Sequence, residues 1–136
     1  MILLDTNICT AAFRDDRRVA SRLIQYGGQI CIPWVVAAEL KFGIEKLCLM
    51  GKPVSKLRAR VERLFAVSSG VLLCTEAVLD HYAILRAKLE IVGTPIGASD
   101  LWIAAQALAE DALLITDNVR EFSRVPGLRI ENWLKR

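Results

Sequence analysis

The sequence predicts an α/β fold, a three-layer α/β/α sandwich with a central, mostly parallel sheet, formed as a single domain by residues 1–136. Short apolar runs alternate with helical patterns, which is typical of parallel strands joined by right-handed crossovers. Apolar residues make up 54% of the chain, as expected for a sheet that is covered on both faces. No repeat, linker or low-complexity segment divides the chain, which favours a single compact unit.

The strands are predicted from short apolar runs that end at turn-forming residues. The first run, Met1–Leu4, leads directly into Asp5, Thr6 and Asn7, so we expect a buried strand with Asp5 at its carboxyl end. Further strands are expected at Ile30–Ile32, Val71–Cys74, Leu113–Thr116 and, at one edge, Leu128–Ile130.

The helices are predicted from apolar residues at helical spacing and from residues that start or stop helices. Gly27 and Gly28 stop the second helix, Pro33 suits the first turn of the third, and Thr75 is expected to cap the fifth. We expect a short helix that follows Asn7 and runs through Phe13, and further helices at Val19–Tyr26, Trp34 to about Met50, Lys52–Ser68 and from Thr75 to Val92. A nearly all-apolar helix is expected to open at Ser99 or Asp100.

Composition narrows the possible functions. A formal charge of +3 is compatible with nucleic-acid binding but does not indicate it. The four scattered cysteines and the single histidine do not cluster, which disfavours a zinc site. The sequence lacks a signal-peptide pattern and an apolar run of about 20 residues, so a cytoplasmic protein is expected.

Four carboxylates stand in apolar surroundings, and each has an ordinary explanation. Asp5 could cap the helix that follows it, and Asp100 could favour the positive end of its helix. Glu39 could do the same or extend to solvent, and Asp117, followed by Asn118, could form an Asx turn.

Their common position in the fold is less ordinary. Asp5 and Asp117 end predicted strands, whereas Glu39 and Asp100 lie in early turns of helices. Parallel topology puts strand ends and these helix starts at one edge of the sheet, so the four acids can converge there. An all-oxygen set without histidine or cysteine suits Mg²⁺ or Mn²⁺. Such a centre can hydrolyse a phosphodiester with metal-activated water.

Two other acid-based families fit less well. A haloacid-dehalogenase-type phosphatase needs a second aspartate at the position of Asn7, and a response-regulator receiver needs an aspartate after its third strand, where this chain has Cys74 and Thr75. Neither pattern is present.

The motifs that contain the four acids resemble the PIN domain, and more closely the toxin ribonucleases of bacterial VapBC toxin–antitoxin pairs. The resemblance rests on Leu4–Asn7, Ala38–Leu40, Thr94–Ala105, Ile115–Asn118 and the tail Arg120–Leu128. It covers essentially the whole chain and preserves the order of the motifs.

The resemblance implies a Mg²⁺-dependent endoribonuclease, with Mn²⁺ as a substitute metal, whose RNA target could be a transfer RNA. Asp5 and Asp100 would be the principal metal ligands and Glu39 and Asp117 would complete the catalytic acidic set. Thr6, Asn7 and Thr116 would support them by hydrogen bonds.

Two departures from the family pattern affect this expectation. Ser99 replaces a common asparagine. Asp117 stands where many of these toxins have asparagine, which favours a complete set of four acids in this chain.

The resemblance also implies a VapB-like antitoxin partner, a homodimer and a toxin–antitoxin hetero-oligomer. Two alternatives stay open from the sequence. One is a PIN nuclease of RNA processing that has no antitoxin, and the other is a non-catalytic PIN binding module. The complete set of four acids speaks against the binding module, and the absence of a short open reading frame beside the gene would favour the RNA-processing nuclease. The basic segment 52–63 is better explained as a solvated helix face than as an RNA-binding stripe.

Overall fold

The computed structural model describes residues 1–134, so the last two residues of the predicted domain lie outside the described residues. Five parallel strands form one sheet in the order β3-β2-β1-β4-β5. They are β1 (Ile2–Leu4), β2 (Ile30–Pro33), β3 (Val71–Leu72), β4 (Leu113–Ile115) and β5 (Ile130–Glu131). The predicted α/β architecture is confirmed, and every pairing is parallel.

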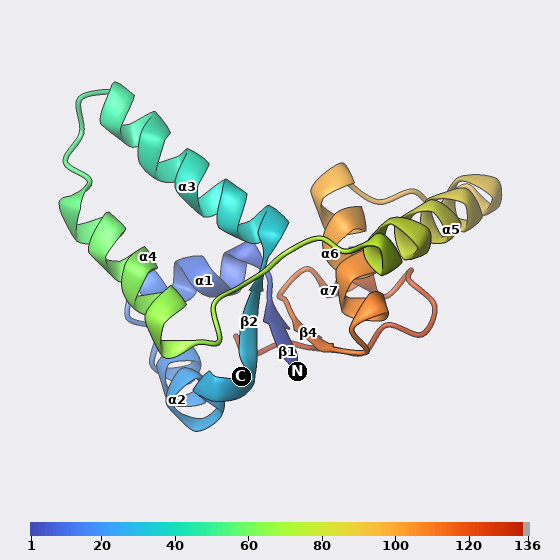
Figure 1. The fold of residues 1–136 in the computed structure, drawn as a ribbon, viewed down its shortest axis with the longest axis horizontal. Helices are drawn as coiled ribbons and strands as arrows, with labels where there is room; N and C mark the ends of the chain where they lie inside the picture. The colour runs from blue at the N-terminus through green and yellow to red at the C-terminus, as the bar shows by residue number, and fades with distance from the viewer. Residues whose placement is uncertain (135–136) are drawn as a thin grey trace.

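Helices flank the sheet and carry most of the chain (Figure 1). They are α1 (Thr6–Phe13), α2 (Arg17–Tyr26), α3 (Trp34–Leu49), α4 (Ser55–Val67), α5 (Glu76–Val92), α6 (Ala98–Ala109) and α7 (Val119–Phe122), with a 3₁₀ turn at Gly27–Gln29. The buried core lies between the sheet and these helices and includes Leu3, Leu4 and Leu114, none of which is exposed to solvent.

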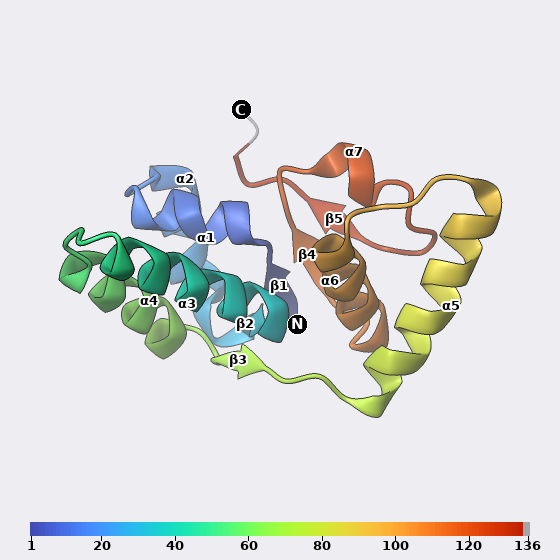
Figure 2. The same ribbon diagram turned by 90° about the horizontal axis from the view of Figure 1, so that it is seen from above.

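The helices form two groups on either side of the central strands. Seen from above, α3 and α4 extend together on one side of the sheet, whereas α5 and α6 extend on the other (Figure 2). An aromatic cluster joins these groups: Tyr82 of α5 stacks on Trp102 of α6 at 3.7 Å, and Trp34 of α3 meets Trp102 edge-on at 5.6 Å. Stacked and edge-on aromatic pairs stabilise such contacts beyond simple burial. The cluster therefore fixes the helices that carry Glu39 and Asp100 relative to each other.

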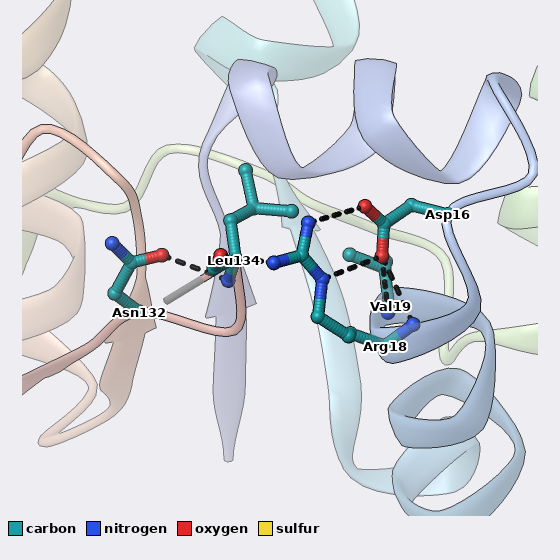
Figure 3. Close-up of polar contacts among 5 residues, drawn as sticks. All are labelled: Asp16, Arg18, Val19, Asn132 and Leu134. Carbon is teal, nitrogen blue, oxygen red and sulfur yellow. Dashed lines mark hydrogen bonds and ion pairs between the residues drawn. The ribbon is translucent and has the colours of Figure 1, made fainter. Parts of the chain in front are cut away.

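The last described residues pack against the start of α2 (Figure 3). Asp16 caps α2 by accepting hydrogen bonds from the backbone N–H groups of Arg18 and Val19. The Arg18 guanidinium binds the Asp16 carboxylate at 2.8 Å and also donates to the backbone carbonyl of Leu134. This charged cap explains why α2 begins at Arg17, two residues before the predicted start at Val19.

Several predicted boundaries were wrong, for local reasons. Thr75 occupies the N-cap position of α5, but its side chain makes no capping hydrogen bond. The helix that Ser99 or Asp100 was expected to open begins at Ala98, after Gly97.

Other elements are shorter or shifted. Helix α4 starts at Ser55 instead of Lys52, β3 ends at Leu72 instead of Cys74, β4 ends at Ile115 with Thr116 just beyond it, and β5 is Ile130–Glu131 instead of Leu128–Ile130. These strands are only two or three residues long, so a shift of one residue is a large part of each.

No helix among residues 1–134 is long and apolar enough to cross a membrane.

Candidate active site

The candidate site lies where the order of the strands reverses. From β1 the chain passes to β2 and β3 on one side, and then returns to β4 and β5 on the other side of β1. Ligands of open α/β sheets bind at such a switch point, at the carboxyl ends of the strands. Asp5 follows β1 there, and its backbone N–H donates to the carbonyl of Ile115 at the end of β4, at 2.9 Å.

Asp5 is the most enclosed carboxylate of the set, with 5% of its surface exposed. Its Oδ2 accepts a hydrogen bond from the hydroxyl of Thr116 at 2.7 Å, and its Oδ1 accepts one from the backbone N–H of Thr6 at 2.8 Å. Asp5 also caps α1, as the ordinary explanation of this residue predicted.

Two of the other predicted acids are held by residues next to Asp5. The Thr6 hydroxyl donates to Oε2 of Glu39 on α3 at 2.7 Å. The Asn7 side-chain amide donates to Oδ1 of Asp117 at 2.8 Å. The start of α1 therefore connects Glu39 of α3 and Asp117, which follows β4, to the residues beside Asp5. Each of the three residues predicted to support the acids, Thr6, Asn7 and Thr116, forms a hydrogen bond with at least one acid.

Asp100 lies in the first turn of α6 and is half-buried. Its Oδ2 accepts a hydrogen bond from the side-chain amide of Asn118 at 3.0 Å, and the same amide nitrogen donates to Oε2 of Glu121 at 2.9 Å. Asn118 and Glu121 were not predicted as site residues. The Asp117–Asn118 pair looked like an ordinary turn, and the short helix α7 that carries Glu121 was not predicted.

Burial and neighbouring negative charges raise the pKa values of two carboxyl groups of the site, those of Asp5 and Asp100. Burial raises the pKa of Asp5, the hydrogen bonds from Thr116 and Thr6 lower it, and the charges of Asp117 and Glu39 raise it again. Burial likewise raises the pKa of Asp100 to about 7, assisted by a hydrogen bond with Glu121 and by the charges of Asp5 and Glu121. Glu121 keeps its charge, because its hydrogen bonds with Asp100 and Asn118 lower its pKa.

This surplus of negative charge suits a hard divalent cation. Among residues 1–134, no three acidic, His or Cys side chains form a ready-made metal-binding group. Mg²⁺ does not require one, because it keeps several waters and binds proteins through one or two carboxylates. Carboxylate oxygens are its preferred protein ligands. Burial and, to a lesser extent, neighbouring negative charges raise the pKa values of Asp5 and Asp100, and a bound cation would oppose both effects.

A hollow with mostly apolar walls lies elsewhere. It has a volume of about 720 Å³, lies between α1, α2 and α4, and is lined mainly by apolar side chains, including Phe13, Leu23, Ile24, Leu64 and Val67. None of the four predicted acids lines it, so it is separate from the candidate site. Arg60, at its border, donates to the carbonyl of Phe13 and lies 3.3 Å from Asp15, and thereby ties α4 to α1.

Comparisons with known proteins agree with this fold. The family model described as PIN domain matches residues 2–128. Ribonuclease VapC2 of Rickettsia felis is 38% identical over 136 residues, which cover 98% of each chain. The tRNA(fMet)-specific endonuclease VapC of Shigella flexneri is 34% identical over 132 residues, which cover 96% of each chain.

Solved structures show the same similarity. The crystal structure of DNA-bound VapBC from Salmonella typhimurium matches with a TM-score of 0.85 and 31% identity, over 97% of both chains. VapBC2 from Rickettsia felis, bound to a DNA fragment from its promoter, matches with a TM-score of 0.81 and 32% identity, over 98% of this chain and 99% of that one.

The match over residues 2–128 shows that the chain belongs to the PIN-domain family. Its parallel five-stranded sheet agrees with that family's fold. Within that family it is a ribonuclease of the VapC type. Ribonucleases of this family depend in general on a divalent metal ion.

Proposed function

We propose that the chain is the toxin of a type II toxin–antitoxin pair and hydrolyses RNA phosphodiester bonds at the Asp5–Asp100 site with Mg²⁺. The observation that supports this most is the closeness of Glu39, Asp100 and Asp117 to the buried Asp5. Thr6 and Asn7, next to Asp5, donate hydrogen bonds to Glu39 and Asp117, and the charge of Asp5 acts on Asp100. The assignment of Mg²⁺ follows from the all-oxygen donor set.

Each acid has a distinct part in this proposal. Asp5 and Asp100 would hold Mg²⁺, and Glu39 and Asp117 would complete the negative shell around it. When bound, the ion supplies an acidified water and positive charge beside the phosphoryl oxygens. Thr116 and Thr6 donate to the two oxygens of Asp5, which favours the ionised form against the effect of burial and orients the carboxylate by fixed donors.

Cleavage of RNA by the purified protein tests the proposal. We expect the wild-type protein to cut RNA in Mg²⁺ and to lose cleavage in EDTA, and Asp5→Asn and Asp100→Asn to lose it in Mg²⁺. Transfer RNA is the proposed substrate class, because the Shigella flexneri relative is named a tRNA(fMet)-specific endonuclease. Sequencing the 5′ ends of the fragments identifies the target. A folded Asp5→Asn protein with full activity would refute the proposed site.

An antitoxin protein is the proposed partner, because the matching structures are VapBC complexes. The apolar hollow between α1, α2 and α4 is the surface that we propose for it. Ile24 at its border is 87% exposed and Val67 is 47% exposed, so a partner would remove apolar surface from water.

We further propose a homodimer, a toxin–antitoxin hetero-oligomer and a cytoplasmic location. A short reading frame beside the gene, whose product co-purifies with the chain and blocks cleavage, tests the pairing. Cleavage unaffected by that product would contradict it.

A further inference from the structure

A small hollow lies between α5 and α6, separate from the one between α1, α2 and α4. Figure 2 shows the two helices side by side, joined by the loop that follows α5. The hollow has a volume of about 180 Å³. The larger apolar side chains of its lining are buried or half-buried and come from both helices and the loop: Tyr82, Leu89, Ile96 and Leu101. Its interior is therefore mainly apolar, as in most small-molecule sites.

Contacts within the protein hold the walls of this hollow in place. The Tyr82 ring stacks on that of Trp102 at 3.7 Å, with 8° between the two planes. In the loop, the backbone carbonyl of Pro95 accepts a hydrogen bond from the Arg124 guanidinium at 2.9 Å. A ligand that enters such a preformed site does not have to order its walls, which favours binding.

Two charged side chains of α5 border the hollow, and each has a polar atom left for a ligand. Arg86 donates from Nε to Oε1 of Glu90 at 2.9 Å and from Nη1 to the Tyr82 hydroxyl at 3.0 Å. Within residues 1–134, the hydrogen bonds leave Nη2 of Arg86 and Oε2 of Glu90 without a protein partner. A donor and an acceptor therefore stand together at the border, and the edge of a nucleobase presents the complementary acceptors and donors.

The hollow lies within one helical turn of a proposed metal ligand. Ala98 and Leu101 line it, and they flank Asp100 in the first turn of α6. One turn is roughly 5 Å long. A phosphate beside Asp100 and a base in the hollow can therefore belong to the same nucleotide or to adjacent ones.

The chemistry of the hollow favours a base over the other parts of an RNA chain. Sites for drug-sized ligands have volumes of about 300–1,000 Å³, so this smaller hollow suits one flat ring system. Its apolar walls would leave a phosphate or a ribose without enough hydrogen-bond partners. Proteins that read single-stranded RNA typically place an unstacked base against aromatic and arginine side chains and bind its edge by hydrogen bonds.

We propose that the hollow between α5 and α6 binds one nucleobase of the RNA substrate beside the phosphodiester that is cut. Arg86 and Glu90 bind the edge of the base, and Tyr82 and Ile96 contact its ring. This inference rests on the proposed function, because it assigns a sequence preference to the same ribonuclease. Paired hydrogen bonds to a base edge discriminate against the wrong base by about 5- to 150-fold.

Binding of the base alone is measured first, with the four nucleoside 5′-monophosphates as probes. Each is titrated into the wild-type protein while the leucine and isoleucine methyl signals are followed by NMR. We expect saturable shifts at Leu89, Ile96 and Leu101, largest for one of the four bases. The methyl signals of Ile24 and Leu64, in the hollow between α1, α2 and α4, are the internal control and should stay in place.

The second measurement is the sequence preference of RNA cleavage, obtained by sequencing the 5′ ends of the fragments. Arg86→Ala and Glu90→Gln should each lower the preference at one nucleotide position next to the cut, by about 5- to 150-fold, and leave Mg²⁺ affinity unchanged. Lys88→Ala is the matched control, because Lys88 is also an exposed cation of α5 but does not line the hollow. Ile96→Phe, which fills part of the hollow, should weaken monophosphate binding. Thermal unfolding of each variant shows that it is folded.

Several results would overturn the inference. They are the absence of shifts at Leu89, Ile96 and Leu101 with every monophosphate, and a cleavage preference in Arg86→Ala and Glu90→Gln equal to that of the wild type. Shifts of these signals with protein concentration alone would also overturn it, because a second copy of the chain would then occupy the hollow. A protein that cleaves RNA but gives any of these results refutes this inference alone. A protein that binds a monophosphate in the hollow but does not cleave RNA refutes the proposed function.

Discussion

Replacing Thr116 by valine removes one hydroxyl from the centre of the site and leaves the shape of the side chain nearly unchanged. Thr116 has no exposed surface, and its hydroxyl both donates to Asp5 at 2.7 Å and accepts from the Asn118 backbone at 2.9 Å. The variant therefore leaves a buried carboxylate oxygen without its donor and a backbone N–H without its acceptor. A hydrogen bond to a charged group contributes about 1.5–3 kcal/mol.

The size of the effect on folding and on metal binding follows from these contacts. A loss of about 2 kcal/mol in a chain of this size lowers Tm by roughly 5–10 °C. Because the Thr116 hydrogen bond lowers the pKa of Asp5, its removal raises that pKa further and favours the protonated form, which does not bind metal. We expect Mg²⁺ affinity to fall about 10- to 100-fold.

Thermal unfolding and Mg²⁺ calorimetry of Thr116→Val measure both effects. Thr10→Val is the matched control, since the Thr10 hydroxyl donates to a backbone carbonyl within α1, that of Thr6, and contacts none of the acids. The control should change Tm by little and leave Mg²⁺ affinity unchanged. If Thr116→Val behaved like Thr10→Val in both measurements, the hydrogen bonds around Asp5 would not have the role assigned to them.

Three other predictions follow from the described contacts. The pKa of Asp100 is raised to about 7, so in the metal-free protein this carboxyl binds more proton in the folded than in the unfolded state between about pH 4 and 7. Its contribution to stability should therefore fall as pH rises through that range. Asp100→Asn should remove this contribution, and a pH dependence of stability identical to that of the wild type would contradict it. Phe122→Ala should cost about 3–5 kcal/mol in urea unfolding, because Phe122 is fully buried and anchors the loop of Thr116 and Asn118, whereas a cost below that of the exposed Val119→Ala would be inconsistent with this anchoring. Ile24→Glu should weaken antitoxin binding by 10-fold or more, since burying an isoleucine contributes about 1.5–3 kcal/mol, and leave RNA cleavage intact; undiminished binding would argue against the proposed surface.

The positions of the four acids relative to the sheet could be predicted from the sequence because each follows a simple local rule. Met1–Leu4 and Leu113–Thr116 are apolar runs that end in polar residues, and parallel topology places such ends at one edge. The prediction that Thr6, Asn7 and Thr116 support the acids came from the family resemblance. Their observed contacts are consistent with it, and their effect on catalysis stays a prediction.

The parts that sequence reasoning missed depend on contacts between distant elements. Glu121 lies on a four-residue helix, too short to show a helical pattern, and it reaches Asp100 only through the Asn118 amide. Helix α2 begins at Arg17 because Asp16 caps it, and helix α6 begins at Ala98 because Gly97 occupies its N-cap position. Both starts depend on the backbone conformation of the cap residue, which the apolar pattern of the sequence does not indicate. Arg86, which the sequence places on the helix before Asp100, pairs within α5 with Glu90 at 2.9 Å, because that acid lies one helical turn away.

The most direct test of the central claim is a calorimetric titration of Mg²⁺ into the RNA-free wild-type protein and into Asp5→Asn. This substitution keeps the size of the side chain and removes its charge, so it separates metal binding from the folding of the switch point. We predict a Mg²⁺ site in the wild-type protein that is lost in a folded Asp5→Asn protein. Equal Mg²⁺ binding by the two proteins would contradict the assignment of Asp5 as a metal ligand.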